Sequence, residues 1–233
     1  TPLYSSAASD VYKRQVIRGA ANRLGAAALA LGLALGAGAA LANTSPQPAV
    51  LDQRDKALVQ DIEDFLNGIT TLEAGFVQLT ASGSYAKGRL YLKRPGRMRF
   101  EYDPPVPYLL VSDGTWFIYV DKELEQVTYL PLRKTPADLL LRADFSFADG
   151  LVITRLERSA STVQIDVVDE EDPDLGRVTM TFIRDPLTLR SWTVRDQQGQ
   201  RIQVTLMNPL YGLRLDNDLF RFVNTFDRPG RNE

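Results

Sequence analysis

Apolar and polar residues alternate along most of this chain, a pattern that is typical of β-strands with one buried face. The period changes between residues 51 and 69, where apolar side chains recur every three or four positions. These side chains are Leu58, Ile62, Phe65, Leu66 and Ile69. Acidic residues fill many of the positions between them. The segment therefore predicts one amphipathic helix, ending near Gly68, that packs its apolar stripe on a sheet.

The alternating segments are short and are separated by turn residues. Short links favour antiparallel pairing, because a parallel pair needs a crossover of about a dozen residues or more. We expect a mainly β fold, an antiparallel meander of about eleven strands that curls into a barrel or half-barrel. The strands are expected at Leu72–Phe76, Gly88–Arg94, Met98–Tyr102, a hairpin spanning 108–120 around Asp113-Gly114, Gln126–Leu130, Leu151–Arg158, Thr162–Val168, Arg177–Arg184, Leu189–Asp196 and Arg201–Met207.

The segment between residues 131 and 150 interrupts this meander. Thr135 is predicted as a helix N-cap, with Pro136 at the first helical position and Asp138 completing a capping box. Three leucines follow, Leu139–Leu141, and they cannot all face one side of a short helix. Such a helix must be covered on more than one flank or must itself cover something, so we expect it to be a lid.

The stretch from Gly88 to Tyr102 places one arginine, Arg94, on the parity of its apolar residues. A three-residue loop at residues 95–97 would keep the two strands' apolar faces together, so we predict that loop. In the resulting register Arg94 pairs with Met98, Leu92 with Phe100 and Leu90 with Tyr102. Arg94 then stands at the mouth of an apolar face.

Two interpretations of Arg94 follow from this position. In the simpler one it ends a hairpin and extends past Met98 to reach water. In the other, its guanidinium donates to backbone carbonyls of a covering element, such as the end of the Leu-rich helix. The second interpretation makes Arg94 a latch that holds the lid closed.

The composition of the chain removes most common catalytic chemistry. The 233 residues include no cysteine and no histidine, which excludes disulfides, thiolate nucleophiles, the usual zinc sites and histidine-based triads. We expect no metal and no cofactor. The acidic run at 166–176 could be read as a calcium loop, but it lacks the ligand spacing of an EF-hand. A solvated hairpin tip is the favoured interpretation.

The N-terminal region is expected to lie outside the folded domain. Residues 1–15 resemble translated adapter sequence, and residues 16–42 combine basic Arg18 and Arg23, an apolar run and an Ala-Leu-Ala ending. This combination is typical of a secretory signal peptide; a membrane anchor is the alternative. The mature domain, 43–233, would then be exported and soluble. Its net charge of about −5, after removal of four basic residues and one acidic residue, argues against a nucleic-acid partner.

Several short motifs, taken in order, resemble those of a known family. They are Ala74–Gln78, Gly88–Pro95, Leu110–Gly114 and Thr135-Pro136. Their order and spacing extend over most of residues 51–223, and the chain is similar to the periplasmic outer-membrane lipoprotein carriers (LolA-like). That resemblance implies an incomplete, half-open antiparallel barrel whose helices close the mouth of a hydrophobic cavity for acyl chains.

The same resemblance implies a set of ligand-binding residues. The family's functional arginine corresponds to Arg94, and nearby cavity positions correspond to Met98 and Phe100. This sequence departs from the family pattern at Gly96-Arg97 and at Met98, where an aromatic ring is common, and these departures bear on cavity shape. The full expected set is Leu90, Leu92, Arg94, Met98, Phe100, Leu139, Leu140 and Leu141.

Three functions remain in competition at this point. The favoured one is a monomeric periplasmic carrier of acylated lipoproteins, loaded by an inner-membrane exporter complex and unloaded to an outer-membrane lipoprotein receptor. A lipid-binding or envelope-stress sensor module of the same fold is the alternative. The least favoured is an enzyme using acidic pairs, Asp121 with Glu123 or Asp216 with Asp218, because such pairs in turns are expected to be solvated.

Overall fold

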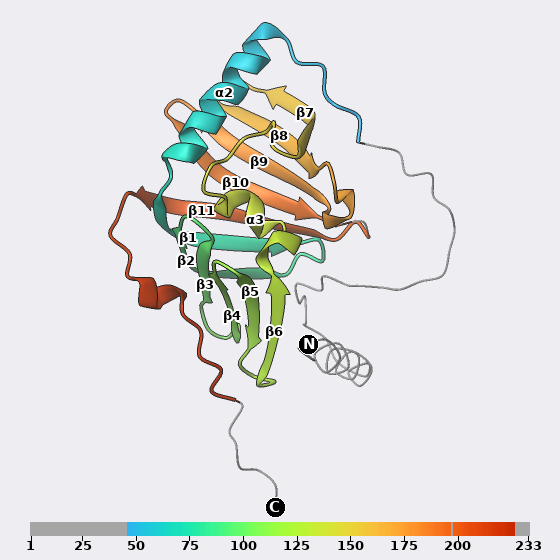
Figure 1. Cartoon of the computed structure of the whole chain (residues 1–233). Coiled ribbons are helices and arrows are strands. Elements are labelled where there is room, and N and C mark those ends of the chain that lie inside the picture. Colours follow the sequence, from blue (N-terminus) through green and yellow to red (C-terminus); the bar gives the residue numbers. More distant parts are fainter. Residues whose placement is uncertain (1–45, 197, 227–233) are drawn as a thin grey trace, which may run out of the picture. The chain divides into compact units, whose positions relative to one another are not determined.

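The computed structural model describes residues 46–196 and 198–226 (Figure 1). The predictions of a non-native segment at 1–15 and a signal peptide at 16–42 lie outside these residues. Within them, none of the helices is long and apolar enough to cross a membrane.

Eleven strands form one antiparallel sheet, as the alternation predicted. The two halves of the sheet meet where β1 pairs with β11, and β6 and β7 are the outermost strands. The sheet is therefore open and is not a closed barrel. In chain order the strands are β1 (Thr71–Thr80), β2 (Tyr85–Lys93), β3 (Arg97–Tyr102), β4 (Tyr108–Asp113), β5 (Trp116–Asp121), β6 (Gln126–Pro131), β7 (Leu151–Arg158), β8 (Thr162–Asp169), β9 (Arg177–Arg184), β10 (Leu187–Arg195) and β11 (Arg201–Tyr211).

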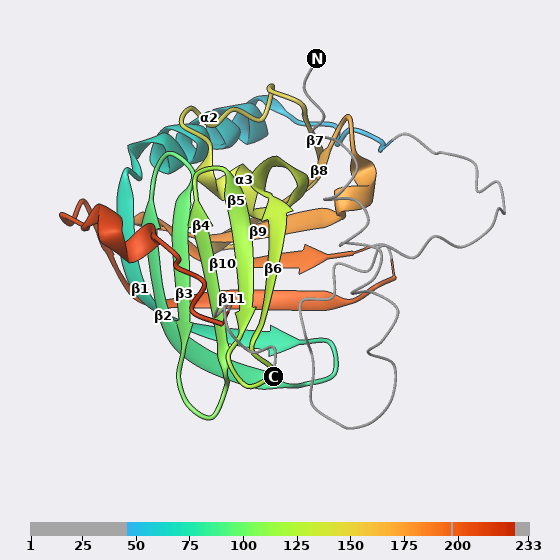
Figure 2. The ribbon, with the colours of Figure 1, turned by 60° about the horizontal axis from the view of Figure 1, so that its bottom comes forward.

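The sheet is strongly curled. Phe100 on β3 and Trp192 on β10 have ring centroids 6.4 Å apart, although three strands separate theirs in the sheet. In a flat sheet four strand spacings would place them about 19 Å apart. The inner faces of the two halves thus meet, and Figure 2 shows β2–β6 in front of β9–β11. We call the surface that carries Phe100 and Trp192 the inner face.

Helix α2 (Gln53–Gly68) lies across one end of the curled sheet (Figure 1). Asp52 and Asp55 form a reciprocal capping box that starts it, and it ends at Gly68 as predicted. Its apolar stripe is buried at Ile62 and Leu66, and the ring of Phe65 meets that of Phe182 on β9 edge-on at 6.1 Å. The helix closes one end of the inner face.

The segment from β6 to β7 crosses the opening of the sheet. It begins with a 3-10 turn, η1 (Leu132–Lys134), and continues into α3 (Ala137–Leu141). We call Leu132–Leu141 the lid. The three consecutive leucines are all buried, which confirms that this helix is covered on more than one flank.

The predicted start of the lid helix was wrong. Thr135 does not cap α3; its hydroxyl donates to the carbonyl of Leu132 at 2.7 Å and so completes the η1 turn. Asp138 accepts from Arg142 at 3.2 Å instead of completing a capping box. The Thr135 hydroxyl is bonded to a carbonyl of the preceding turn, and a prediction of helix caps from the local sequence does not consider that acceptor.

The β2–β3 hairpin has an odd loop, but the loop is one residue earlier than predicted. Lys93 pairs with Arg97, so the three loop residues are Arg94, Pro95 and Gly96. Leu92 therefore pairs with Met98, and Leu90 with Phe100. A register shift of two residues keeps every side chain on its predicted face, which is why alternation alone could not separate the two registers.

The C-terminal segment covers the outer face of the first half of the sheet. Leu109, Val111, Ile118 and Val120 form an apolar cluster there, against which Phe222 and Phe226 pack. Polar contacts hold this segment, since Lys93 donates to the Leu215 carbonyl at 2.8 Å and Arg99 donates to that of Leu219 at 3.1 Å. Strands β4 and β5 are consequently apolar on both faces.

Candidate functional site

Arg94 bridges the two helices that close the inner face. Its Nε donates to the carbonyl oxygen of Leu140 at 2.9 Å, and its Nη1 donates to that of Leu66 at 2.6 Å. Leu140 lies in the last turn of α3 and Leu66 in the last turn of α2. Of the two interpretations of Arg94, the structure shows the one in which it reaches carbonyls of a covering element. We call this pair of hydrogen bonds the Arg94 bridge.

The electrostatics of this bridge are those of a partly desolvated cation. Burial lowers the pKa of Arg94 to about 10, so the side chain still carries its charge at neutral pH. The last carbonyls of a helix bear partial negative charge, because they lack intrahelical donors and lie at the negative end of the helix dipole. Both bonds of Arg94 are therefore made to acceptors at the negative ends of helices, although the Leu66 carbonyl also accepts from the Ile69 N–H at 3.2 Å.

The lid is also attached to the β2–β3 loop through the backbone. The Gly96 N–H donates to the Leu141 carbonyl at 2.9 Å, and the Gly96 carbonyl accepts from the Ser112 hydroxyl at 2.7 Å. Ser112 is fully buried on β4. The loop that presents Arg94 is thus fixed to the sheet on one side and to the lid on the other.

The chain that follows the lid is tied to α2. Asn67 exchanges two hydrogen bonds with the backbone of Phe145, at 2.7 and 2.9 Å. Glu63 accepts from the Ser146 hydroxyl at 2.8 Å and from the Phe147 N–H at 2.5 Å. The lid is consequently attached on both sides, to the end of β6 and to the segment pinned on α2.

The predicted ligand-binding side chains come together beneath and within the lid. Leu90, Leu92, Met98 and Phe100 lie on the inner face of β2 and β3, and the three lid leucines lie above the opening. All seven apolar members are between 0% and 6% exposed. These side chains are therefore not open to solvent in this conformation, and an acyl chain can reach them only after the lid moves.

The sequence analysis missed the aromatic residues that join this face together. Phe76 on β1 contacts Phe100 at 5.0 Å and Tyr102 at 5.1 Å, both edge-on. Trp192 closes the contact from the other half of the sheet. The alternation of Leu72, Ala74 and Phe76 could have identified Phe76, whereas the position of Trp192 depends on the curl of the whole sheet.

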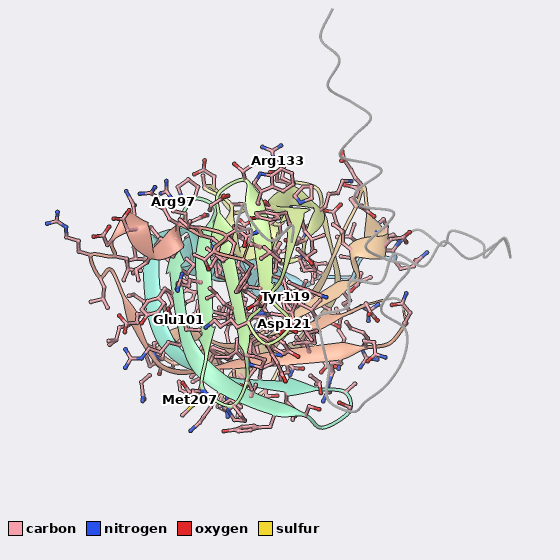
Figure 3. The ribbon with its side chains drawn as sticks, turned by 90° about the horizontal axis from the view of Figure 1, so that it is seen from below. Arg97, Glu101, Tyr119, Asp121, Arg133 and Met207 are labelled. Atoms are coloured by element: carbon pink, nitrogen blue, oxygen red, sulfur yellow. The ribbon has the colours of Figure 1, made fainter. Side chains whose placement is uncertain are left out.

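A group of tyrosines continues the inner face toward the ends of β3, β4 and β5. Tyr102 donates to Gln78 at 2.6 Å, and the rings of Tyr108 and Tyr119 lie 5.4 Å apart. Burial raises the pKa of Tyr102 and that of Tyr119 above the usual range. Tyr119 and Asp121 lie close together on β5 (Figure 3). These hydroxyls make this part of the inner face more polar than the part beneath the lid.

Two hollows lie outside the inner face. A cavity of about 30 Å³ beside the lid is lined by Leu139 and by residues of β8 and β9, and it has room for a few waters only. A shallow groove of about 530 Å³ lies between α2 and the ends of the neighbouring strands, lined by Arg54, Arg158 and Arg184 among others. Neither hollow resembles an apolar site for a long hydrocarbon chain.

The acidic pairs proposed for an enzyme are parts of turns. The Asp121 carboxylate is buried, contrary to the solvated position expected, and accepts from the N–H groups of Glu123 and Leu124, each at 3.0 Å. Asp216 accepts from the Asp218 N–H at 3.0 Å at the start of a 3-10 turn, η3 (Asn217–Phe220). Among the described residues no group of three or more acidic side chains is arranged to hold a metal ion. The acidic run ends in another short turn, η2 (Pro173–Leu175).

The chain is similar to several known proteins. The crystal structure of the LolA superfamily protein NE2245 from Nitrosomonas europaea matches with a TM-score of 0.44 and 9% identity, over 70% of this chain and 97% of that chain. An outer-membrane lipoprotein carrier protein of Pseudomonas aeruginosa is 36% identical over 190 residues, which are 75% of this chain and 86% of that protein. The carrier protein of Methylococcus capsulatus is 29% identical over 170 residues, 69% of this chain and 81% of that protein. The profile of the family described as outer membrane lipoprotein carrier protein LolA matches residues 67–223. The chain therefore belongs to the LolA family of outer membrane lipoprotein carrier proteins.

Proposed function

We propose that this protein is a periplasmic carrier that binds the acyl chains of lipoproteins against its inner face and moves them from the inner to the outer membrane. The observation that supports this most directly is the Arg94 bridge, which closes an apolar surface with a small number of polar bonds. The names of the relatives point to the same cargo. Nothing in this role requires catalysis, and we propose no enzymatic activity.

The energetics explain why such a carrier needs a closed resting state. Each buried methylene is worth about 0.8 kcal/mol, so an acyl chain of about fifteen carbons gains about 12 kcal/mol by leaving water. The empty inner face would face the same unfavourable contact with water if it stayed open. In the closed state the lid leucines, Leu90 and Leu92 are all buried, which avoids that contact, and incoming acyl chains replace the lid leucines.

The partners follow from this cycle. Cargo would arrive from an inner-membrane lipoprotein exporter complex and leave to an outer-membrane lipoprotein receptor that binds it more tightly. A lipid-binding or envelope-stress sensor with the same fold is the second candidate. It would hold free lipids, whereas a carrier would hold acylated protein.

The first experiment identifies what the protein holds. Co-expression with a triacylated lipoprotein, followed by purification without detergent, should yield a soluble one-to-one complex. Mass spectrometry of the bound material separates the two candidates, since lipids without any protein would favour the sensor. A lipoprotein that stays in the membrane fraction would refute the carrier.

A matched pair of variants tests the place of binding. Leu140→Glu introduces a charge beneath the lid, where Leu140 is buried, and should reduce the yield of complex at least tenfold. Ala143→Glu places the same charge on an exposed position two residues beyond α3 and should leave the yield unchanged. Equal yields from the two variants would remove the lid from the binding site.

A further inference from the structure

Three tyrosines form a continuous band across the inner face of the first half of the sheet. We call Tyr102, Tyr108 and Tyr119 the tyrosine band. Its rings contact one another in turn, with centroids 6.2 Å apart between Tyr102 and Tyr108 and 5.4 Å apart between Tyr108 and Tyr119. Tyr102 also meets Phe76 across Gly88, where a Cβ would lie 2.9 Å from the Phe76 ring. Through Phe76 the row of rings reaches from β1 to β5.

The tyrosine band lies at a boundary on the inner face. Leu110 pairs with both Phe100 and Tyr119, so these side chains share that face. Phe100 and Leu110 are 6% and 5% exposed, whereas the three tyrosines are only partly buried. Membrane proteins place tyrosine at the hydrocarbon–water interface, at the level of lipid headgroups, because its ring is apolar and its hydroxyl is polar. By the same reasoning, acyl tails on the inner face would run from the band toward the lid.

The hydroxyls of the band can hydrogen-bond a polar ligand. Tyr102 donates its proton to the Gln78 side chain at 2.6 Å. Tyr108 and Tyr119 lie close enough to share one hydrogen bond, which uses one of their two protons. The other proton is left for an acceptor on the inner face. A surface that bound only hydrocarbon would be better formed by phenylalanine, because a buried hydroxyl without a partner costs free energy.

A carboxylate lies beside the band. Asp121 is two residues beyond Tyr119 on β5 and pairs with Tyr108 on β4, so its side chain also faces inward (Figure 3). It is 8% exposed, and within the described residues it forms no ion pair. Two like charges repel more strongly near a protein surface than in bulk water. Asp121 therefore makes this part of the inner face unfavourable for an anionic group.

We propose that the tyrosine band binds the ester carbonyls of the acylated glycerol in the cargo, and that Asp121 beside it excludes glycerol bearing a phosphate. This inference rests on the proposed carrier function. The glycerol of a lipoprotein is joined to cysteine by an uncharged thioether, whereas the glycerol of a phospholipid carries an anionic phosphate. Burial of similar acyl chains cannot distinguish the two. A hydrogen bond to the ester and a repulsive charge nearby together supply the discrimination.

Two synthetic lipopeptides test the ester contact. They have hydrocarbon chains of equal length, attached to glycerol through esters in one and through ethers, which lack carbonyl acceptors, in the other. The natural protein should bind the diester about fivefold more tightly than the diether, as measured by fluorescence anisotropy of a labelled peptide portion. Tyr108→Phe combined with Tyr119→Phe should remove this preference. Tyr85→Phe removes the hydroxyl of an exposed tyrosine on the outer face and should retain it.

A neutral variant tests the role of Asp121. Asp121→Asn keeps an oxygen that can accept from the N–H groups of Glu123 and Leu124, and it removes the negative charge. Its affinity for a labelled phosphatidylglycerol should rise several-fold relative to its affinity for the diester lipopeptide. Asp113→Asn makes the same change at an exposed aspartate with the same kind of turn hydrogen bonds, and it should leave that ratio unchanged.

Each other result overturns the proposal in an identifiable way. Equal affinities of the natural protein for diester and diether would refute the ester contact, and so would a preference that survives the loss of both hydroxyls. An unchanged ratio in Asp121→Asn would refute the exclusion of phosphate. In these cases the lipopeptides still bind, and the carrier function stands. If neither lipopeptide binds, the carrier function fails, and this inference fails with it.

Discussion

The Arg94 bridge makes a quantitative prediction about lid closure. Arg94→Ala removes both donors and leaves the carbonyls of Leu66 and Leu140 without them. The variant should remain folded, since Arg94 lies in a hairpin loop whose backbone N–H is held separately by the Thr70 carbonyl at 2.9 Å. The change therefore acts mainly on the balance between the closed and open lid.

The size of the effect follows from two opposing contributions. A hydrogen bond to a charged group contributes about 1.5–3 kcal/mol, and the bond to Leu140 is the one that joins Arg94 to the lid, so this bond favours closure by about 1.5–3 kcal/mol. Burial of the cation opposes closure, as the lowered pKa of Arg94 indicates. Because the Arg94 side chain is only partly buried, solvent reduces the cost of burying its charge. We subtract roughly half of the hydrogen-bond contribution for that cost. About 1 kcal/mol remains, a factor of about 5 in the closed-to-open ratio.

Hydrogen exchange at the Gly96 amide measures this ratio directly, because that N–H donates to the Leu141 carbonyl of the lid. Exchange at Gly96 should be up to about 5-fold faster in Arg94→Ala. Amides of the central strand β9 serve as the control and should change only as far as global stability changes. Arg94→Lys keeps the charge but cannot bridge two carbonyls with a planar fork, so it should give an intermediate rate. Unchanged exchange at Gly96 in Arg94→Ala would refute the latch.

The other predictions concern stability. Gly88→Ala should lower the free energy of unfolding in urea by about 2 kcal/mol or more, because a Cβ there would lie 1.9 Å from the Glu101 carbonyl oxygen. Gly68→Ala, with nothing within 4 Å, should instead raise it by up to about 1 kcal/mol, and equal effects would contradict the packing at Gly88. Asp52→Ala should be less stable than the natural protein near neutral pH, because the backbone N–H of Asp55 lowers the pKa of Asp52 below 3.8 and favours its charged form. The contribution of a carboxylate with a lowered pKa is lost as the pH falls through that value, so the gap should persist to about pH 3.8 and narrow only below it.

Sequence patterns were sufficient for the features that depend on local periodicity. Alternation identified the strands and placed Leu90, Leu92, Met98 and Phe100 on one face, and the run Leu139–Leu141 identified a helix that had to be covered. The parity of Arg94 singled it out as a residue with an unusual position. These inferences hold because a strand's side-chain period is fixed, whichever strands lie beside it.

Long-range pairing was beyond the reach of the same patterns. The carbonyl of Leu66 was not foreseen as a partner of Arg94, since it depends on where the end of α2 lies relative to a hairpin 28 residues away. The contact of Phe100 with Trp192 likewise requires the pairing of β1 with β11 and the curl that follows from it. The incorrect prediction of a cap at Thr135 has the opposite origin. The local sequence favours an N-cap there, but the Thr135 hydroxyl donates to the nearby Leu132 carbonyl instead.

The two outermost strands of the sheet, β6 and β7, do not pair with each other, and this affects how much the inner face can hold. A closed barrel has a radius set by its number of strands and their stagger, so its interior cannot grow without breaking hydrogen bonds. Here β6 and β7 are at opposite ends of the strand order, and the covalent connection between them, residues 132–150, includes the lid. The circumference can therefore widen by unrolling, with every ladder intact. Under the proposed function, one and the same wall would then enclose cargoes with different numbers of hydrocarbon tails.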